Sequence, residues 1–272
     1  MPAHPTPLRF RRLLLTGAAG NLGRELRPRL KAYCDALRVS DAAPLGAAAP
    51  GEEVQQAALQ DHDAVHALLQ GVDAVVHLGG VSVEGPFEPI LQANIIGMHH
   101  LYEAARKHGV KRIVFASSNH VTGFYRQDQV IDPRAPMRPD GHYGLSKAFG
   151  ENLAQFYFDR YRLETVSLRI GSSFAEPKDR RMLATWMSYD DLERLVVSSL
   201  TAPRVGHTVI YGLSDNTVRW WDNTPAAHIG YRPQDSSESF RAAVEARQPS
   251  LDINDAATLY QGGGFCAKGP YE

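Results

Sequence analysis

The sequence predicts an α/β fold, a doubly wound parallel sheet of about seven strands with helices on both faces. Short apolar runs alternate with segments whose apolar residues recur at helical spacing, from residue 11 to about residue 214. The apolar runs are continuous, which is typical of strands buried on both faces. No linker interrupts the alternation, so the 272 residues are predicted to form a single domain.

The predicted strands are runs rich in Val, Ile and Leu. In chain order they cover residues 13–15, 36–40, 54–57, 73–78, 112–118, 165–170 and 207–211. The predicted helices cover residues 22–31, a segment containing Val65, Leu68 and Leu69, and residues 90–108, 143–161 and 189–200. Pro28 lies inside the first helix and is expected to kink or shorten it. Residues 42–51, rich in Ala, Pro and Gly, are predicted to form a loop.

Three glycines follow the first predicted strand at the spacing Gly17-x-x-Gly20-x-x-Gly23. In such a motif one glycine permits a tight turn, one lets the backbone approach a pyrophosphate, and one packs the helix on the strand. The helix that begins at Asn21 and Leu22 would direct its free N–H groups at the phosphates. This context predicts a Rossmann-type dinucleotide site.

Asp41 ends the second predicted strand, about 20 residues after the glycines. A carboxylate at this position can accept hydrogen bonds from the adenosine ribose hydroxyls. It would also repel the additional phosphate of NADP, so the predicted cofactor is NAD.

Polar and small residues also follow the other predicted strands, in segments 77–82, 117–120 and 171–173. Each segment alone could be an ordinary turn. Because the carboxyl ends of parallel strands meet at one edge of the sheet, where ligands bind, their joint recurrence favours a ligand site.

Tyr143 and Lys147 lie one turn apart on a predicted helix, about 6 Å along its axis. A phenol with a pKa near 10 is a poor base, but the ammonium and a bound nicotinamide cation would favour the phenolate. Ser118, at the end of the fifth strand, could hold a substrate hydroxyl while Tyr143 removes its proton. The same spacing fits an ordinary amphipathic helix, and the glycine motif shifts the interpretation toward a dehydrogenase.

The glycine motif, Ser118 and Tyr143-x-x-x-Lys147 resemble the extended short-chain dehydrogenase/reductase superfamily over residues 11–215. Segments 77–84, 115–120, 169–172, 181–183 and 261–265 are similar to the bacterial uronate dehydrogenases, and this likeness continues to the C-terminus. The resemblance implies NAD-dependent oxidation of the anomeric carbon of D-galacturonate and D-glucuronate to the aldarolactone.

The resemblance also implies contacts for individual residues. The implied cofactor contacts are Asn21, Leu22, Asp41, Leu59, Leu78, Gly79, Gly80, Tyr143, Lys147 and Ile170. The implied substrate contacts are Ser82, Ser118, Asn119, His120, Ser172, Arg181 and Phe265, besides the base Tyr143. Asn94 is assigned to the cofactor site, with simple packing as its alternative role. Ala58 replaces the family's usual Asp, which predicts a somewhat weaker affinity for NAD.

Residues 11–171 are predicted to form the NAD-binding core, and residues 172–272 to complete it and supply a small substrate-covering segment. So short a second part fits a free hexuronic acid better than a nucleotide-linked sugar. An acid needs a cation, and the loop after Ser172 contains Lys178, Arg180 and Arg181. Arg181, followed by apolar residues, is predicted to bind the carboxylate bidentately, and the other two to be solvated.

Composition excludes several other classes of protein. A net charge of −1 gives no electrostatic footprint for nucleic acid or an anionic membrane. Cys34 and Cys266 are too few for a disulfide scaffold or zinc site, and are predicted to be buried in a reducing compartment. His62 and His66 lack a third ligand nearby in the sequence, so no metal is predicted. No apolar run is long enough to span a membrane, so a cytoplasmic protein is expected.

Some expectations concern the ends of the chain and its assembly. Residues 1–8 are rich in proline and are expected to fray. A homo-oligomer is expected. Trp220 and Trp221 are predicted to pack the C-terminal segment on the core, although an exposed pair could line an oligomer contact.

Two alternative functional hypotheses fit the same motifs. A sugar epimerase or dehydratase of the same superfamily would recycle its nicotinamide and release no NADH. A cofactor-sensing module would bind NAD without catalysis, against which the presence of Ser118, Tyr143 and Lys147 argues.

Overall fold

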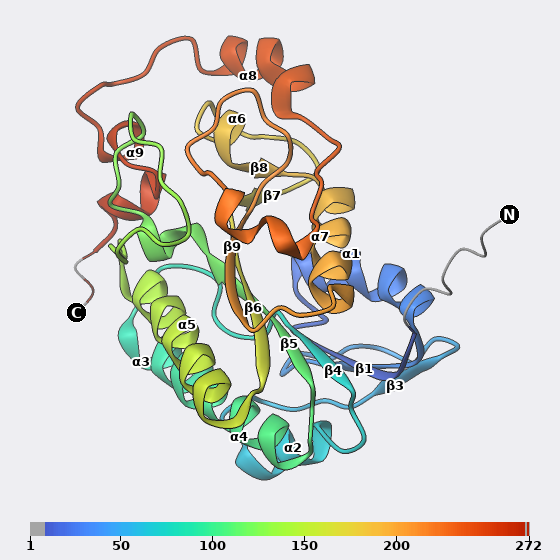
Figure 1. The fold of residues 1–272 in the computed structure, drawn as a ribbon. Helices are drawn as coiled ribbons and strands as arrows, with labels where there is room; N and C mark the ends of the chain where they lie inside the picture. Colours follow the sequence, from blue (N-terminus) through green and yellow to red (C-terminus); the bar gives the residue numbers. More distant parts are fainter. Residues whose placement is uncertain (1–8, 270, 272) are drawn as a thin grey trace, which may run out of the picture.

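The computed structural model describes residues 9–269 and 271, and its centre is a seven-stranded parallel sheet of order β3-β2-β1-β4-β5-β6-β9 (Figure 1). The strands are β1 (Phe10–Thr16), β2 (Cys34–Ser40), β3 (Glu52–Val54), β4 (Ala74–His77), β5 (Arg112–Ser118), β6 (Glu164–Ile170) and β9 (His207–Gly212). The strand order reverses between β1 and β4, which opens a crevice at the carboxyl ends of these strands. The segment expected to fray, residues 1–8, lies outside the described residues.

Helices cover both faces of the sheet (Figure 1). One face carries α1 (Asn21–Leu30) and α7 (Tyr189–Thr201), and the other carries α2 (His62–Leu68), α4 (Gly97–Lys107) and α5 (His142–Tyr161). The alternation of side chains along β1 divides the core accordingly. Leu13 and Leu15 pack in the cluster that includes Leu26 of α1, whereas Leu14 packs in the cluster that includes Leu101 of α4.

The seven parallel strands and the two helical layers confirm the predicted fold class, while some element boundaries were wrong. The third strand lies at Glu52–Val54 and not at residues 54–57. The first helix continues through Pro28 to Leu30, so the proline does not end it. A 3₁₀ turn, Lys31–Tyr33, then leads into β2.

The predicted helix 90–108 is not a single α-helix. It begins as α3 (Phe87–Ile90), passes through a π-helical segment (Leu91–Ile96) and continues as α4. Hydrophobic periodicity does not signal a π-helical segment, because the adjoining turns keep the helical spacing. Such segments are frequent at functional sites, and this one carries Asn94.

Beyond β6 the chain completes the sheet and then returns over its carboxyl edge, where the orange and red segments lie in Figure 1. The additional elements are β7 (Ser172–Ser173), α6 (Met182–Thr185), β8 (Trp186–Met187), α8 (Arg241–Arg247), α9 (Ala256–Leu259) and 3₁₀ turns at Thr224–Ile229, Ser237–Phe240 and Gly263–Ala267. Trp220 and Trp221 are buried, and Trp221 stacks on Tyr211 with ring centroids 4.8 Å apart. Their predicted packing role is confirmed. No helix of the described segments is long and apolar enough to cross a bilayer.

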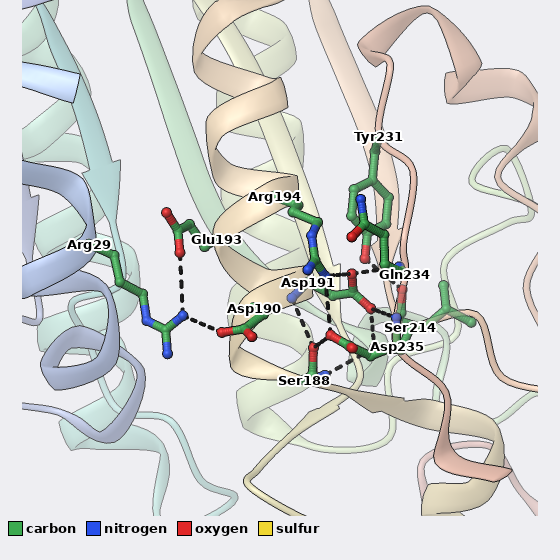
Figure 2. Close-up of polar contacts among 11 residues, drawn as sticks. Arg29, Ser188, Asp190, Asp191, Glu193, Arg194, Ser214, Tyr231, Gln234 and Asp235 are labelled. Carbon is green, nitrogen blue, oxygen red and sulfur yellow. Dashed lines mark hydrogen bonds and ion pairs between the residues drawn. The ribbon is translucent and has the colours of Figure 1, made fainter. Parts of the chain in front are cut away.

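A polar cluster ties this returning segment to α7 (Figure 2). The Asp191 carboxylate is fully buried, and it accepts hydrogen bonds from the Ser214 hydroxyl at 2.6 Å and the Gln234 and Asp235 N–H groups at 2.9 and 3.1 Å. It also pairs with Arg194 on its own helix. A buried carboxylate with so many donors fixes the start of the returning segment.

A buried ion pair connects α5 to β6. The Glu151 carboxylate is paired bidentately by Arg169, with Nε–Oε1 and Nη2–Oε2 distances of 3.0 and 2.8 Å, and both side chains are at most 2% exposed. Ser117 donates to the same carboxylate at 2.6 Å, and Arg169 also donates to the Tyr211 hydroxyl at 3.1 Å. This network holds α5, the helix that carries Tyr143 and Lys147, against β6.

Glu151→Ala is therefore expected to lower the free energy of unfolding by about 3–5 kcal/mol, because it leaves the Arg169 guanidinium buried and unpaired. Chemical denaturation measures this loss. Asp128→Ala is the matched control, since the Asp128–Arg126 pair is exposed and its loss should cost less than about 1 kcal/mol. Equal, small effects of the two substitutions would contradict a structural role for the buried pair.

Candidate active site

A single cavity of about 960 Å³ lies at the carboxyl ends of the strands. It is lined by every residue that the sequence assigned to catalysis, cofactor or substrate, with the exception of Asn94. These residues are Gly17, Gly20, Asn21, Leu22, Gly23, Asp41, Leu59, Leu78, Gly79, Gly80, Ser82, Ser118, Asn119, His120, Tyr143, Lys147, Ile170, Ser172, Arg181 and Phe265. The volume is at the upper end of the range for small-molecule sites, about 300–1,000 Å³.

The glycine turn has the shape of a dinucleotide cradle. Gly17 has φ +71°, and a Cβ there would lie 2.6 Å from the Leu78 carbonyl carbon. A Cβ on Gly23 would collide with the Gly17 carbonyl oxygen. Gly20 caps α1 without any side-chain hydrogen bond, so the first N–H groups of the helix remain available to a diphosphate. The residues present therefore fit the cofactor that the motif implies.

Asp41 is held at the end of β2 by two backbone hydrogen bonds. Its Oδ2 accepts from the Ala19 N–H at 3.0 Å and its Oδ1 from the Ala43 N–H at 2.9 Å. Among residues 9–269 and 271 no cation pairs with this carboxylate, so its negative charge faces the cavity unneutralised. This is the carboxylate that the sequence predicts to bind the adenosine ribose.

Asn94 lies behind the cavity wall. Its Oδ1 accepts from the Val81 N–H at 2.8 Å, and its Nδ2 donates to the Val81 carbonyl at 3.0 Å and the Ser146 hydroxyl at 2.9 Å. The side chain thereby fixes the loop after β4 to α5. This is the packing alternative for Asn94, and it differs from the cofactor contact to which the residue was assigned.

The three candidate catalytic residues come together on β5 and α5. Lys147 Nζ donates to the Ala116 carbonyl at 2.8 Å and lies 5.6 Å from the centroid of the Tyr143 ring. The Ser118 hydroxyl accepts a hydrogen bond from the His120 N–H at 3.2 Å, which fixes this hydroxyl at the carboxyl end of β5. All three side chains line the cavity and are largely buried.

The electrostatics of the protein alone differ from the sequence-based expectation. Burial raises the pKa of Tyr143 to about 12, and hydrogen bonding with Ser118 opposes this rise only in part. Burial also lowers the pKa of Lys147 to about 8. Desolvation disfavours both charged forms, so the neighbouring ammonium by itself does not produce a phenolate. The lowered phenol pKa predicted from the sequence requires the second cation, that of the nicotinamide.

Arg181 is a partly buried cation held by neutral acceptors. Its Nε donates to the Gln261 carbonyl at 2.7 Å and its Nη1 to the Ser172 hydroxyl at 3.3 Å. Its Nη2 donates at 2.9 Å to Asn119 Oδ1, with the Asn119 amide oriented so that its nitrogen donates to the Ile170 carbonyl. No carboxylate of the described chain pairs with it, and two of its five N–H groups remain for a ligand.

Asn119 and Ser172, both predicted to touch the substrate, thus hold the guanidinium in place. Of the two neighbouring cations predicted to be solvated, Lys178 is exposed as predicted, and its Nζ lies 3.9 Å from the centroid of the Phe174 ring. Arg180 is partly buried instead, and its Nε donates to the Gln248 carbonyl at 2.7 Å. Sequence gives no sign of the Arg180 contact, because its partner is 68 residues away.

The aromatic wall of the cavity comes from the C-terminal segment. The Phe265 ring stacks on His120 with centroids 4.0 Å apart and an interplanar angle of 13°. The His120 ring meets Tyr143 edge-on at 5.7 Å. Ser82 also lines the cavity and is exposed. Cys34 is buried as predicted, whereas Cys266 is only partly buried and lies next to this wall.

Two buried residues that the sequence analysis did not assign hold this arrangement. The Glu84 carboxylate accepts from the His142 and Tyr143 N–H groups at 3.0 and 2.8 Å, so it caps α5 at the candidate base. Gln261, fully buried, supplies the carbonyl that holds Arg181. Neither contact has a local sequence signal, since Glu84 lies 59 residues from Tyr143 and Gln261 lies 80 from Arg181.

The histidine pair on α2 has neighbours on α4 and at its C-cap. The rings of His62 and His66 are 4.5 Å apart, and His100 and His108 lie 5.4 and 5.6 Å from them. Within the described ranges, however, no group of three or more His, Cys, Asp or Glu residues has the geometry to hold a metal ion.

Comparison with known proteins identifies the family of the chain. The model of the NAD dependent epimerase/dehydratase family matches residues 13–204. The uronate dehydrogenase of Pseudomonas putida is 62% identical over 263 residues, which cover 96% of this chain and 98% of that protein.

Two solved structures have the same fold and high identity. The glucuronic acid dehydrogenase from Chromohalobacter salexigens is 52% identical with a TM-score of 0.94, and the match covers 95% of this chain and 97% of that one. A point mutant of the uronate dehydrogenase from Agrobacterium tumefaciens, solved in complex with NAD, is 50% identical with a TM-score of 0.94 over 96% of this chain and 98% of that one. The chain belongs to the NAD dependent epimerase/dehydratase family and groups within it with the uronate dehydrogenases.

Proposed function

We propose that this protein oxidises hexuronic acids, D-galacturonate and D-glucuronate, at the anomeric carbon with NAD and forms the aldarolactone. The observation that carries the proposal is the Arg181 guanidinium, which is unpaired within the described residues and lines the same cavity as Tyr143. A partly buried cation without a carboxylate partner favours an anionic ligand. The high identity to uronate dehydrogenases over nearly the full chain supports a sugar acid as that ligand.

The glycine turn and the first N–H groups of α1 would hold the diphosphate of NAD, and Asp41 its adenosine ribose. When bound, NAD accepts the hydride that leaves the anomeric carbon. Lys147, anchored on the Ala116 carbonyl, would act together with the nicotinamide cation to favour the phenolate of Tyr143.

The chain's own residues would handle the proton and orient the sugar. Ser118 holds the C1 hydroxyl, and Tyr143 Oη takes its proton while the C1–H bond gives up its electron pair as hydride. The C1–O bond becomes a carbonyl, and because the ring oxygen remains attached to C1 the product is a lactone. Arg181 binds the carboxylate at the other end of the sugar and fixes which carbon meets the nicotinamide.

Appearance of NADH on mixing the protein, NAD and galacturonate tests the proposal. An epimerase or dehydratase would consume the sugar without accumulating NADH, and a cofactor-sensing module would bind NAD and leave the sugar unchanged. Only the proposed oxidation gives NADH in proportion to the sugar consumed.

Asp41 predicts a preference for NAD over NADP of at least about tenfold in kcat/KM, which corresponds to about 1.4 kcal/mol. The reason is its unneutralised carboxylate, which would meet the additional phosphate of NADP. Asp41→Ala should narrow the gap. Steady-state kinetics with both cofactors measure it, and equal rates of the natural protein with NAD and NADP would contradict the assignment.

Tyr143→Phe is expected to lower kcat by about 10²- to 10⁴-fold, since it removes the general base while leaving the ring in place. NAD affinity, measured by titration, should stay nearly unchanged. Lys147→Ala should differ by weakening NAD binding as well, because the lysine is predicted to contact the cofactor. A Phe variant that kept more than about a tenth of kcat would exclude Tyr143 as the base.

Arg181→Ala is expected to lower kcat/KM for galacturonate by roughly two to three orders of magnitude, because a bidentate charged grip contributes about 3–5 kcal/mol. The slow rate with galactose, which has no carboxylate, should barely change. Arg181→Lys should recover only part of the loss, since an ammonium lacks the planar fork.

Arg180→Ala is the matched control for this series, because the Arg180 side chain bonds to Gln248 outside the cavity. It should keep kcat/KM for galacturonate within about twofold. If Arg181→Ala slowed galacturonate and galactose equally, the residue would be structural and the carboxylate would bind elsewhere.

A further inference from the structure

Directly before α5 lies a buried carboxylate without an assigned role. Asp140 is 5% exposed, and its Oδ2 lies 2.6 Å from His120 Nδ1. Its other oxygen, Oδ1, is buried and has no hydrogen-bond partner in the described part of the chain. A buried carboxylate oxygen without a partner is costly, which points to a function for this group.

The surroundings of this carboxylate are shaped by three glycines from three segments. A Cβ on Gly123 or Gly262 would collide with the Asp140 carboxylate, and one on Gly144 would lie 3.0 Å from its Oδ1. Gly144 belongs to α5, and Gly262 belongs to the C-terminal segment that returns over the sheet. The backbone therefore closes around Asp140 more tightly than any side chain would allow.

The partner of Asp140 is the histidine in the cavity wall. The His120 ring is fixed between the stacked Phe265 and the edge of Tyr143. With Nδ1 on Asp140, no hydrogen bond inside the described chain engages Nε2, and His120 lines the cavity. Nε2 is thus the ring atom left for a ligand.

A carboxylate only accepts hydrogen bonds, so a neutral imidazole beside it carries its proton on Nδ1. We propose that Asp140 is a positioning residue that holds His120 as the Nδ1–H tautomer, so that Nε2 accepts a hydrogen bond from a hydroxyl of the sugar. This inference rests on the proposed uronate oxidation. It assigns the two ends of substrate recognition to different chemistries: Arg181 donates to the carboxylate, and His120 accepts from a hydroxyl.

Burial, more than the charges nearby, favours the neutral form of His120. The ionisable groups around the ring and its partners are Glu84, Asp140, Tyr143, Arg181, Cys266 and Lys268. Burial lowers the pKa of His120 below its usual value and Arg181 adds to this, whereas Asp140 and Glu84 oppose it. Removing the Asp140 charge must therefore lower the pKa of His120 further.

Asp140→Asn tests the role, because the amide has the size of the carboxylate and fits the glycine-lined space. Its NH₂ group can donate to Nδ1, which would move the imidazole proton to Nε2 and remove the acceptor. We expect kcat/KM for galacturonate to fall about 10- to 100-fold. The loss should lie mainly in KM, since the hydrogen bond forms in ground and transition states alike, and NAD affinity should be unchanged.

The pH dependence of kcat/KM distinguishes a positioning role of Asp140 from a purely structural one. Where protonation of His120 limits activity, the acid limb of kcat/KM should move to lower pH in Asp140→Asn, since the charge that raises the histidine pKa is gone. Asp191→Asn is the matched control, because it also removes a fully buried carboxylate but lies in the polar cluster on α7. It should lower the melting temperature without moving the acid limb.

The tautomer can be observed directly by ¹⁵N NMR of histidine-labelled wild-type protein, with His120→Gln assigning the signals. We expect a protonated Nδ1 and an unprotonated Nε2 in His120, a result that needs no variant of Asp140 to fold. A protonated Nε2 in the wild type, or an Asp140→Asn variant with unchanged kcat/KM at every pH, would overturn the proposal.

The same samples distinguish the two proposals. If the wild type showed the Nδ1–H tautomer but formed no NADH from any hexuronate, the proposed function and the sugar hydroxyl would be overturned, while the Asp140–His120 arrangement would stand. If it formed NADH but carried the proton on Nε2, uronate oxidation would stand and the positioning role would be overturned.

Discussion

A parallel sheet ends all its strands at one edge, and the candidate site depends on this constraint. The glycine turn follows β1, Asp41 follows β2, Ser118 ends β5 and Ser172 follows Ile170 of β6. Residues as distant in sequence as Gly17 and Arg181 therefore line one cavity. The buried pair of Glu151 and Arg169 stabilises this arrangement, because it joins α5 to β6.

The second requirement of the site is a cation that keeps its charge for a ligand. Arg181 meets only neutral acceptors, which come from η3 (Asn119–Thr122), from β7 and from the returning C-terminal segment. Neutral hydrogen-bond acceptors position a guanidinium without neutralising its charge. The polar cluster at Asp191 and the 3₁₀ turn carrying Phe265 hold the returning segment over the sheet.

The parts of the site that could be predicted from the sequence are those that depend on the spacing of residues close together in the chain. The glycine motif, the acid after β2 and the Tyr143–Lys147 pair each follow from a backbone constraint within a few residues, and all of them line the cavity. The residues that hold them could not be predicted. Glu84 and Gln261 act across 59 and 80 residues, and their contacts exist only in the folded chain.

Residue roles were also harder to predict than residue positions. Asn94 lies behind the wall because a π-helical segment carries it there. Burial raises the pKa of Tyr143 and lowers that of Lys147, because both groups lie in one poorly solvated region. Sequence patterns give the neighbours of a titratable group but not the free energy of its desolvation.

The central claim is that a sugar acid loses a hydride and a proton at its anomeric carbon in this cavity. The most direct measurement follows galacturonate labelled with ¹³C at C1 by NMR while NADH is recorded in the same sample. The account predicts that the hemiacetal C1 signal is replaced by an ester carbonyl signal, with one NADH formed per sugar. A C1 that remains a hemiacetal in an altered sugar, without NADH, would contradict it.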